Sequence, residues 1–156
     1  MRFETQLFKH NPPHTYGDCA RTCLACLLDL KPEDVPHFAE LSKCEIEEWN
    51  RLEREFLLSA GFVKFQTAFI FDSVSEALEW SGGAYPGLYM IMLGQSKNGV
   101  NHDVIVCDGE IVWDPSIDKS GIVGPTTDTE AFHFSVLVPT RFLKFGAASA
   151  PNQIER

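Results

Sequence analysis

Hydrophobic residues recur at helical spacing in two segments of the first half of the chain. Between 19 and 30, apolar positions 20, 23, 24, 27 and 28 share one face, which predicts a helix buried along that stripe. In the second segment, Ser42 and Glu45 form a capping-box pattern, and Gly61 suits the position after a last helical turn. The apolar face predicted between them consists of Ile46, Trp49, Leu52, Phe56, Leu57 and Ala60.

The segments around these helices carry weaker patterns. Residues 2–8 alternate loosely and could form an edge strand, whereas 10–17 contain two prolines and predict a loop. Asp18 is placed to cap the first helix. Pro32 and Pro36 predict a short turn before the second helix.

The second half of the chain changes to strand-like patterns. Residues 62–71 predict a strand, and Ser73 with Glu76 predicts the start of a short helix to Trp80, ended by the glycines at 82 and 83. Because helices come first and strands follow, the pattern predicts an α+β fold, with one domain over 1–145 and a loose tail over 146–156. The further predicted strands are 88–93, 103–107, 110–113 and 132–138, separated by Gly, Asn, Asp and Pro.

Composition narrows the classes of partner. A net charge of −9 and a pI near 4.9 argue against nucleic-acid or anionic-membrane partners, since both require clustered Lys and Arg. No signal-peptide pattern and no apolar run of membrane-spanning length is visible, so a cytoplasmic location is expected. The 5 cysteines are odd in number, and three share one predicted helix, which favours reduced thiols over a disulfide scaffold.

Three residues form a candidate catalytic set. Cys19 follows a Gly-Asp turn at the start of the first helix, where the helix dipole and free N–H groups favour a thiolate. His102 opens a predicted strand, and Asp114 follows the next one. A cysteine, a histidine and a carboxylate in this order suit nucleophilic catalysis, with the histidine as base and the carboxylate orienting it.

The hairpin at Asp108-Gly109 decides whether His102 and Asp114 meet. A two-residue loop would place His102 opposite Pro115 and leave Asp114 on the other face. A three-residue loop with a glycine bulge would place His102 directly opposite Asp114, and the function requires this second register.

Metal binding is an alternative role for Cys19 and the Cys and His residues near it in the sequence. Cys19, Cys23 and Cys26 have the CxxxCxxC spacing of iron–sulfur enzymes that use S-adenosylmethionine, but an amphipathic helix does not bring three ligands together, and Cys23 and Cys26 are expected to be core residues. His10, His14 and Cys19 could bind zinc but lack a standard spacing. No metal and no cofactor are expected.

The motifs Gly-Asp-Cys at a helix start, Asn-His-Asp-Val-Ile-Val and Val-Trp-Asp-Pro resemble the papain-like cysteine peptidase superfamily. The closest similarity is to its small compact branch, which includes bacteriocin-processing peptidases of ABC exporters and phage-encoded relatives. The resemblance implies a papain-like fold with Cys19 as nucleophile, His102 as general base and Asp114 as orienting residue. The superfamily's oxyanion Gln five or six residues before the nucleophile is missing, so His14 or Asn11 becomes the candidate donor.

The sequence therefore favours two candidate functions. The first is a thiol-dependent hydrolase or acyl transferase acting on a peptide, a protein or another amide, with residues 94–100 as a candidate wall of the cleft. The second is a catalytically inactive papain-fold binding module, such as a phage accessory protein that acts by occupancy.

Overall fold

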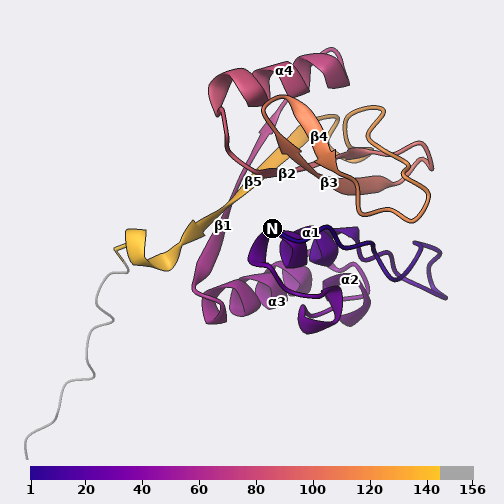
Figure 1. The fold of residues 1–156 in the computed structure, drawn as a ribbon. Coiled ribbons are helices and arrows are strands. Elements are labelled where there is room, and N and C mark those ends of the chain that lie inside the picture. Colours follow the sequence, from indigo (N-terminus) through magenta and orange to yellow (C-terminus); the bar gives the residue numbers. More distant parts are fainter. Residues whose placement is uncertain (145–156) are drawn as a thin grey trace, which may run out of the picture.

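A five-stranded antiparallel sheet forms the centre of the molecule, with the strand order β1-β5-β2-β3-β4 (Figure 1). The computed structural model describes residues 1–144, so the tail predicted over 146–156 lies outside the described residues. The combination of this sheet with helices confirms the predicted α+β class. The strands are β1 (Phe62–Phe69), β2 (Met90–Gln95), β3 (Asn101–Cys107), β4 (Glu110–Trp113) and β5 (Phe132–Pro139).

Helices cover both faces of the sheet (Figure 1). One core layer joins α1 and α3 to Ile91 and Ile105, and the other joins α4 to Met92 and Val104 on the opposite face. The sequence predicts helices followed by a sheet, and the structure differs in one respect. Helix α4 follows β1 in the chain and is the helix that packs on the second face of the sheet. The helices are α1 (Cys19–Leu28), α2 (Phe38–Leu41), α3 (Ile46–Ser59) and α4 (Val74–Ala84), with 3₁₀ turns at Pro32–Asp34 and Thr140–Phe142.

Helix α1 is the central element of the first layer. Its buried residues include Cys23, which lies on the predicted apolar stripe, and Cys26, which borders it; both are inaccessible to solvent, as expected of core residues. The helix ends at Leu28 because Asp29 turns into the left-handed region with φ 63°. Asp18 occupies the N-cap position, but its side chain makes no capping bond, so the expectation of a side-chain cap is wrong.

The start of α3 also differs from the prediction. Glu45 is the N-cap, and its carboxylate accepts hydrogen bonds from the N–H groups of Glu47 and Glu48. Ser42 instead ends the short helix α2, where its hydroxyl donates to the Phe38 carbonyl, so the Ser42–Glu45 capping box is wrong. The predicted turn after the helix is confirmed, since Gly61 has φ 83°.

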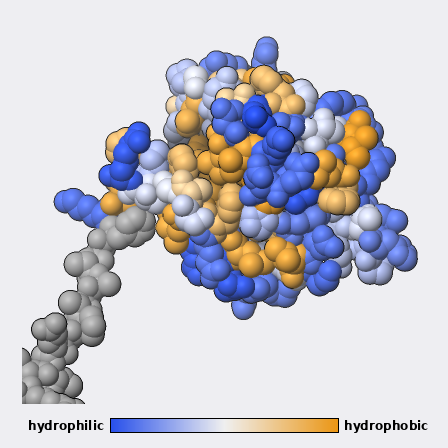
Figure 2. Space-filling model, turned by 60° about the horizontal axis from the view of Figure 1, so that its bottom comes forward, coloured by the Kyte–Doolittle hydropathy of each residue, from blue (hydrophilic) through white to orange (hydrophobic). Residues whose placement is uncertain are grey.

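The outer side of the helical layer keeps some apolar surface. Leu41, Ile46 and Leu58 remain exposed there, and Figure 2 shows apolar patches on this side interrupted by hydrophilic side chains. Among residues 1–144, no helix has both the length and the apolar character needed to cross a membrane.

Helix α4 begins where the sequence predicts but continues past its glycines. Ser73 accepts a hydrogen bond from the Glu76 N–H at 3.1 Å, as its capping pattern suggested. The helix runs through Gly82 and Gly83 to Ala84, so the prediction that these glycines end it is wrong. A Cβ at Gly82 would lie 2.6 Å from the Gly109 nitrogen, so Gly82 lets the helix approach the β3–β4 turn closely.

The predicted strands of the second half are confirmed to within a few residues at each end, whereas residues 2–8 are not a strand. This first segment is extended but pairs irregularly, with Arg2 N–H donating to the Cys26 carbonyl and Gln6 N–H to that of Pro115. It therefore runs between α1 and the loop that follows β4.

We predict opposite effects of alanine at the two neighbouring glycines of α4. Gly82→Ala forces a methyl group against the Asp108-Gly109 turn and should destabilise the protein by about 1–3 kcal/mol. A Cβ at Gly83 would meet nothing within 4 Å outside its own helix, so Gly83→Ala should stabilise by up to about 1 kcal/mol through helix propensity. Urea unfolding of both variants measures the difference, and equal effects would contradict the close approach.

Candidate active site

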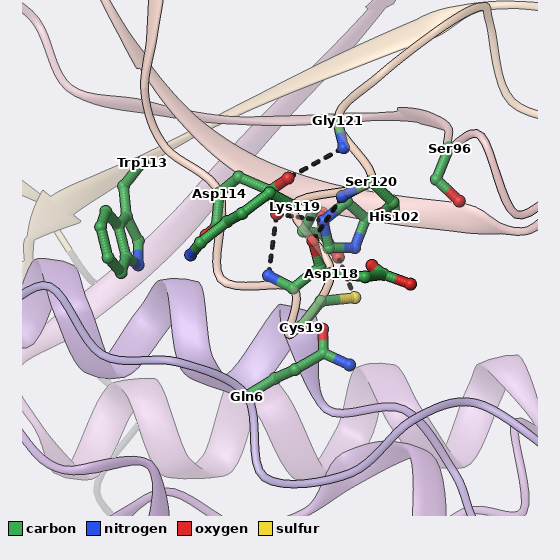
Figure 3. A network of polar contacts seen from close by, with 12 residues as sticks. Gln6, Cys19, Ser96, His102, Trp113, Asp114, Asp118, Lys119, Ser120 and Gly121 are labelled. Atoms are coloured by element: carbon green, nitrogen blue, oxygen red, sulfur yellow. Dashed lines mark hydrogen bonds and ion pairs between the residues drawn. The ribbon is translucent and has the colours of Figure 1, made fainter.

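The sulfur of Cys19 lies at the first residue of α1, facing the start of β3 (Figure 3). The side chain is partly exposed, in contrast to Cys23 and Cys26 on the same helix, which are sealed in the core. In the first turn of a helix the backbone N–H groups have no intrahelical acceptor, and their dipoles favour negative charge. The local structure therefore gives Cys19 access to a ligand and an environment that suits a thiolate.

The β3–β4 turn has the two-residue register, so the requirement for a three-residue loop is wrong. Cys107 pairs with Glu110, and both Asp108 and Gly109 have positive φ, at 51° and 80°. A bulge then shifts the ladder by one residue, and Ile105 pairs with Trp113. Because side chains alternate along a strand, this extra residue turns Asp114 to the face of His102.

The structure brings His102 and Asp114 into contact. The His102 Nε2 atom lies 2.8 Å from Asp114 Oδ1, and Figure 3 shows the imidazole between this carboxyl group and the Cys19 sulfur. The same carboxyl group accepts hydrogen bonds of 2.8 Å from the N–H groups of Ser116 and Gly121. The loop after β4 thus fixes the carboxylate, and the carboxylate fixes the ring.

These contacts shift the pKa values of His102 and Asp114 so that both groups are charged at neutral pH. Burial raises the pKa of Asp114, but the hydrogen bonds from His102, Ser116 and Gly121 outweigh it and hold the pKa well below its usual value. Burial lowers the pKa of His102, but the bond to Asp114 and the contact with Cys19 outweigh it and raise the pKa to about 10. The imidazolium form is favoured at neutral pH.

Asp103 is a further residue of the site that the sequence analysis missed. Its Oδ2 atom lies 3.9 Å from the Cys19 sulfur, which acts as donor. Burial is the main cause that raises the pKa of Asp103 to about 6. Strand alternation was the available signal, since it places 103 with the buried Ile105 on the face covered by α1.

Gln6 is the second residue of the site that the sequence analysis missed, because it lies well before the five or six positions that directly precede Cys19. The side chain is only 9% exposed, and Figure 3 shows its amide beside Cys19. Its Nε2 donates to the Phe8 carbonyl at 2.7 Å, while Oε1 is buried without a partner among the described residues. Neither of the predicted oxyanion donors, Asn11 and His14, lines the cleft, and both are exposed in the turn that precedes Tyr16.

Asp18 positions Gln6 from the start of α1. Its fully buried carboxylate accepts from the N–H groups of Leu7 at 3.2 Å and Phe8 at 2.9 Å, and pairs with Arg21 at 3.0 Å. These bonds attach the N-terminal segment to the helix that carries Cys19. Asp18, directly before Cys19, thus organises the site without capping the helix with its side chain.

A polar cleft of about 170 Å³ opens over Cys19 and His102. The predicted wall segment, 94–100, contributes three residues to it. At its edge Asp118 accepts from Lys9 at 3.0 Å and Asn98 at 3.1 Å, which joins the N-terminal segment to two loops of the sheet. The lining residues are Gln6, Lys9, His10, Gly17, Cys19, Ser96, Asn98, Val100, Asn101, His102, Ser116, Asp118 and Ser120.

The residues considered for metal binding do not converge. Cys19, Cys23 and Cys26 follow one another along a continuous helix, and two of them are buried in its packed face. The Nδ1 atom of His10 accepts from the Gly17 N–H at 3.2 Å, which engages this nitrogen in the loop. Within residues 1–144, no group of three or more His, Cys, Asp or Glu side chains has the geometry of a metal site.

We predict that His102 keeps its proton well above neutral pH. Its imidazole signal in NMR should titrate near pH 10, and Asp114→Asn should lower this midpoint because the accepting carboxylate is lost. Since folding raises this pKa from 6.5, the stability it contributes is complete below pH 6.5 and lost as the pH rises to about 10. Asp128→Asn, which alters a carboxyl group bonded to the neighbouring Asn101, serves as the control; a wild-type midpoint near 6.5 would contradict the contact.

Comparison with protein-family models, curated proteins and solved structures found no match for this chain. The function is therefore inferred from the residues of the site.

Proposed function

We propose that the protein is a thiol-dependent hydrolase or acyl transferase acting on a peptide or other amide bond, in a papain-like arrangement. The observation that carries the proposal is the position of His102, with one ring nitrogen 2.8 Å from the mostly buried carboxylate of Asp114 and the ring beside a partly exposed sulfur at a helix start. A nucleophile, a base and an orienting group meet here from three separate elements.

The chemistry follows from the roles of these groups. Cys19 gives up its proton within the pair with His102, which leaves a thiolate beside an imidazolium. The thiolate attacks the carbonyl carbon, the imidazolium protonates the leaving amine, and a thioester to Cys19 forms. The neutral imidazole then takes a proton from water, which attacks the thioester and releases the acid; in a transferase, an amine replaces water. Asp114 keeps the ring oriented and stabilises its charged form.

The negative oxygen that forms during the attack needs donors. The Cys19 N–H is free of an intrahelical acceptor in the first turn of α1 and is one of them. Gln6 is our candidate for the other, because its amide is buried beside Cys19. The Nε2 atom carries two N–H groups, and the one that is not donated to the Phe8 carbonyl would supply this donor.

The cleft supports a small polar substrate group. Its volume of about 170 Å³ is below the roughly 300–1,000 Å³ typical of sites that enclose a whole ligand. Serine, asparagine and charged side chains predominate in its lining. An extended peptide or an isopeptide link could lie across such a cleft, with only the residue at the cleaved bond seated inside.

One observation favours the second candidate, a binding module without catalysis. The Gln6 Nε2 atom commits one of its two N–H groups to the Phe8 carbonyl at 2.7 Å, and the Oε1 atom of the same amide is buried without a partner among the described residues, so one N–H remains to donate to an oxyanion. A protein in which this remaining Gln6 N–H does not reach the oxyanion would retain the cleft and bind an amide without cleaving it. The two candidates differ in the reactivity of Cys19.

We predict that iodoacetamide alkylates Cys19 faster than an ordinary thiol at mildly acidic pH, and that His102→Ala lowers this rate by a factor on the order of 100, because the imidazolium stabilises the thiolate. Mass spectrometry of the peptide containing Cys19 gives the rate. His133→Ala is the matched control, since His133 lies on β5 and bonds to Gln66 and Thr129 outside the cleft. Labelling of Cys19 at the same rate in wild type and His102→Ala would exclude the enzyme and favour the module.

Gln6 should matter for turnover and not for alkylation. Gln6→Ala is expected to lower kcat on an activated thiol-reactive ester by about 10²–10³, because one oxyanion donor is lost. Its alkylation by iodoacetamide should stay within a few-fold, since that reaction forms no oxyanion. Gln66→Ala, on β1, is the control, and an equal fall of both rates in Gln6→Ala would indicate a structural role instead.

A further inference from the structure

The proposed mechanism leaves one carboxyl group at the nucleophile without a role. Asp103 reaches Cys19 from β3, with 3.9 Å between Oδ2 and the sulfur, while the neighbouring His102 is bonded to Asp114. The Cys19 thiol is the one hydrogen-bond donor that residues 1–144 bring to the Asp103 carboxyl group. A carboxyl group in this position acts directly on the reacting sulfur.

We propose that Asp103 controls the ionisation of the nucleophile: as a carboxylate it accepts the S–H group of Cys19 and opposes loss of that proton, and as a neutral carboxyl group it does not. The inference rests on the proposed function, because it concerns the reactivity of the same sulfur. The step is a proton equilibrium at one S–H bond, and the proton passes to solvent, because His102 already carries its own proton below about pH 10.

The surroundings of Asp103 make its charge variable near neutral pH. Burial raises the pKa of Asp103 to about 6, while the positive charges of His102 and Lys64 act in the opposite direction. Lys64 is paired with the buried Glu53, so its charge is largely compensated. The ionisable groups that face this carboxyl group are Cys19 and Cys23 from α1, His102 from β3, Glu53 from α3 and Lys64 from β1.

A thiolate and a carboxylate at this distance repel each other, whereas a thiol and a carboxylate share a proton. The negative charge of Asp103 also favours the imidazolium form of His102, but His102 is already protonated at neutral pH. The charge of Asp103 therefore changes the ionisation of the Cys19 sulfur and not that of the imidazole. The fraction of Cys19 present as thiolate should therefore rise with pH while Asp103 is neutral and should level off once Asp103 ionises. Above about pH 6 the reactivity of Cys19 should stay nearly constant instead of rising steadily with pH.

The test compares the rate of Cys19 alkylation in wild type and Asp103→Asn from pH 4.5 to pH 8. The two rates should agree below pH 5, where the carboxyl group and the amide are both neutral. Above about pH 6 the variant should become faster, by about tenfold at pH 7, because the opposing charge is absent. Glu110→Gln removes the same charge from the far end of the β3–β4 hairpin and should follow the wild type.

The wild-type profile keeps the proposal testable if Asp103→Asn does not fold. Its logarithmic rate should rise with pH up to about 6 and then level off, whereas a continuous rise to pH 8 would overturn the inference. A variant-to-wild-type ratio that does not change with pH would overturn it as well. Either result, with alkylation still dependent on His102, would leave the proposed function standing; loss of the dependence on His102 would remove both.

Discussion

The buried carboxylate of Asp18 is the interaction on which the site depends. It accepts from two backbone N–H groups of the N-terminal segment and pairs with Arg21, whose side chain is only 8% exposed. Breaking a buried pair of this kind typically costs about 3–5 kcal/mol, because the remaining charge loses its partner inside the protein. The segment that carries Gln6 is therefore held against the helix that carries Cys19, and Gln6, which lies well before Cys19 in the chain, becomes part of the site.

Helix α1 and the sheet meet at Cys19, the proposed nucleophile. Helix α1 supplies the sulfur and β3 supplies the imidazole and a carboxyl group, while the loop after β4 supplies the second carboxyl group. The bulge in the β3–β4 ladder makes this possible, because it turns Asp114 toward His102 while the tight turn keeps its two residues. A local irregularity of one residue thus decides whether the His102 imidazole has a carboxylate partner.

The two carboxyl groups are tuned in opposite directions by their surroundings. Asp114 receives donors from His102, Ser116 and Gly121 and stays ionised, whereas Asp103 is partly buried and has only a weak thiol donor among the described residues, which keeps it neutral to a higher pH. One carboxyl group therefore supplies a constant negative charge to the imidazole. The other supplies a charge that varies around pH 6 beside the sulfur.

The sequence by itself determined the α+β class, the strands of the second half and the three residues around which the site is built, because helical and strand periodicities and turn residues are local signals. It placed the start of α3 and the end of α4 less well, since Ser42 bonds within α2 and α4 continues past Gly82 against the β3–β4 turn. The start of α1 was predicted correctly, but the side chain of Asp18 bonds to the N-terminal segment instead of capping the helix. Only the tertiary structure decided the roles of Gln6 and Asp103. Their places depend on bonds between segments distant in the chain and on burial, and neither leaves a pattern in the residues nearby.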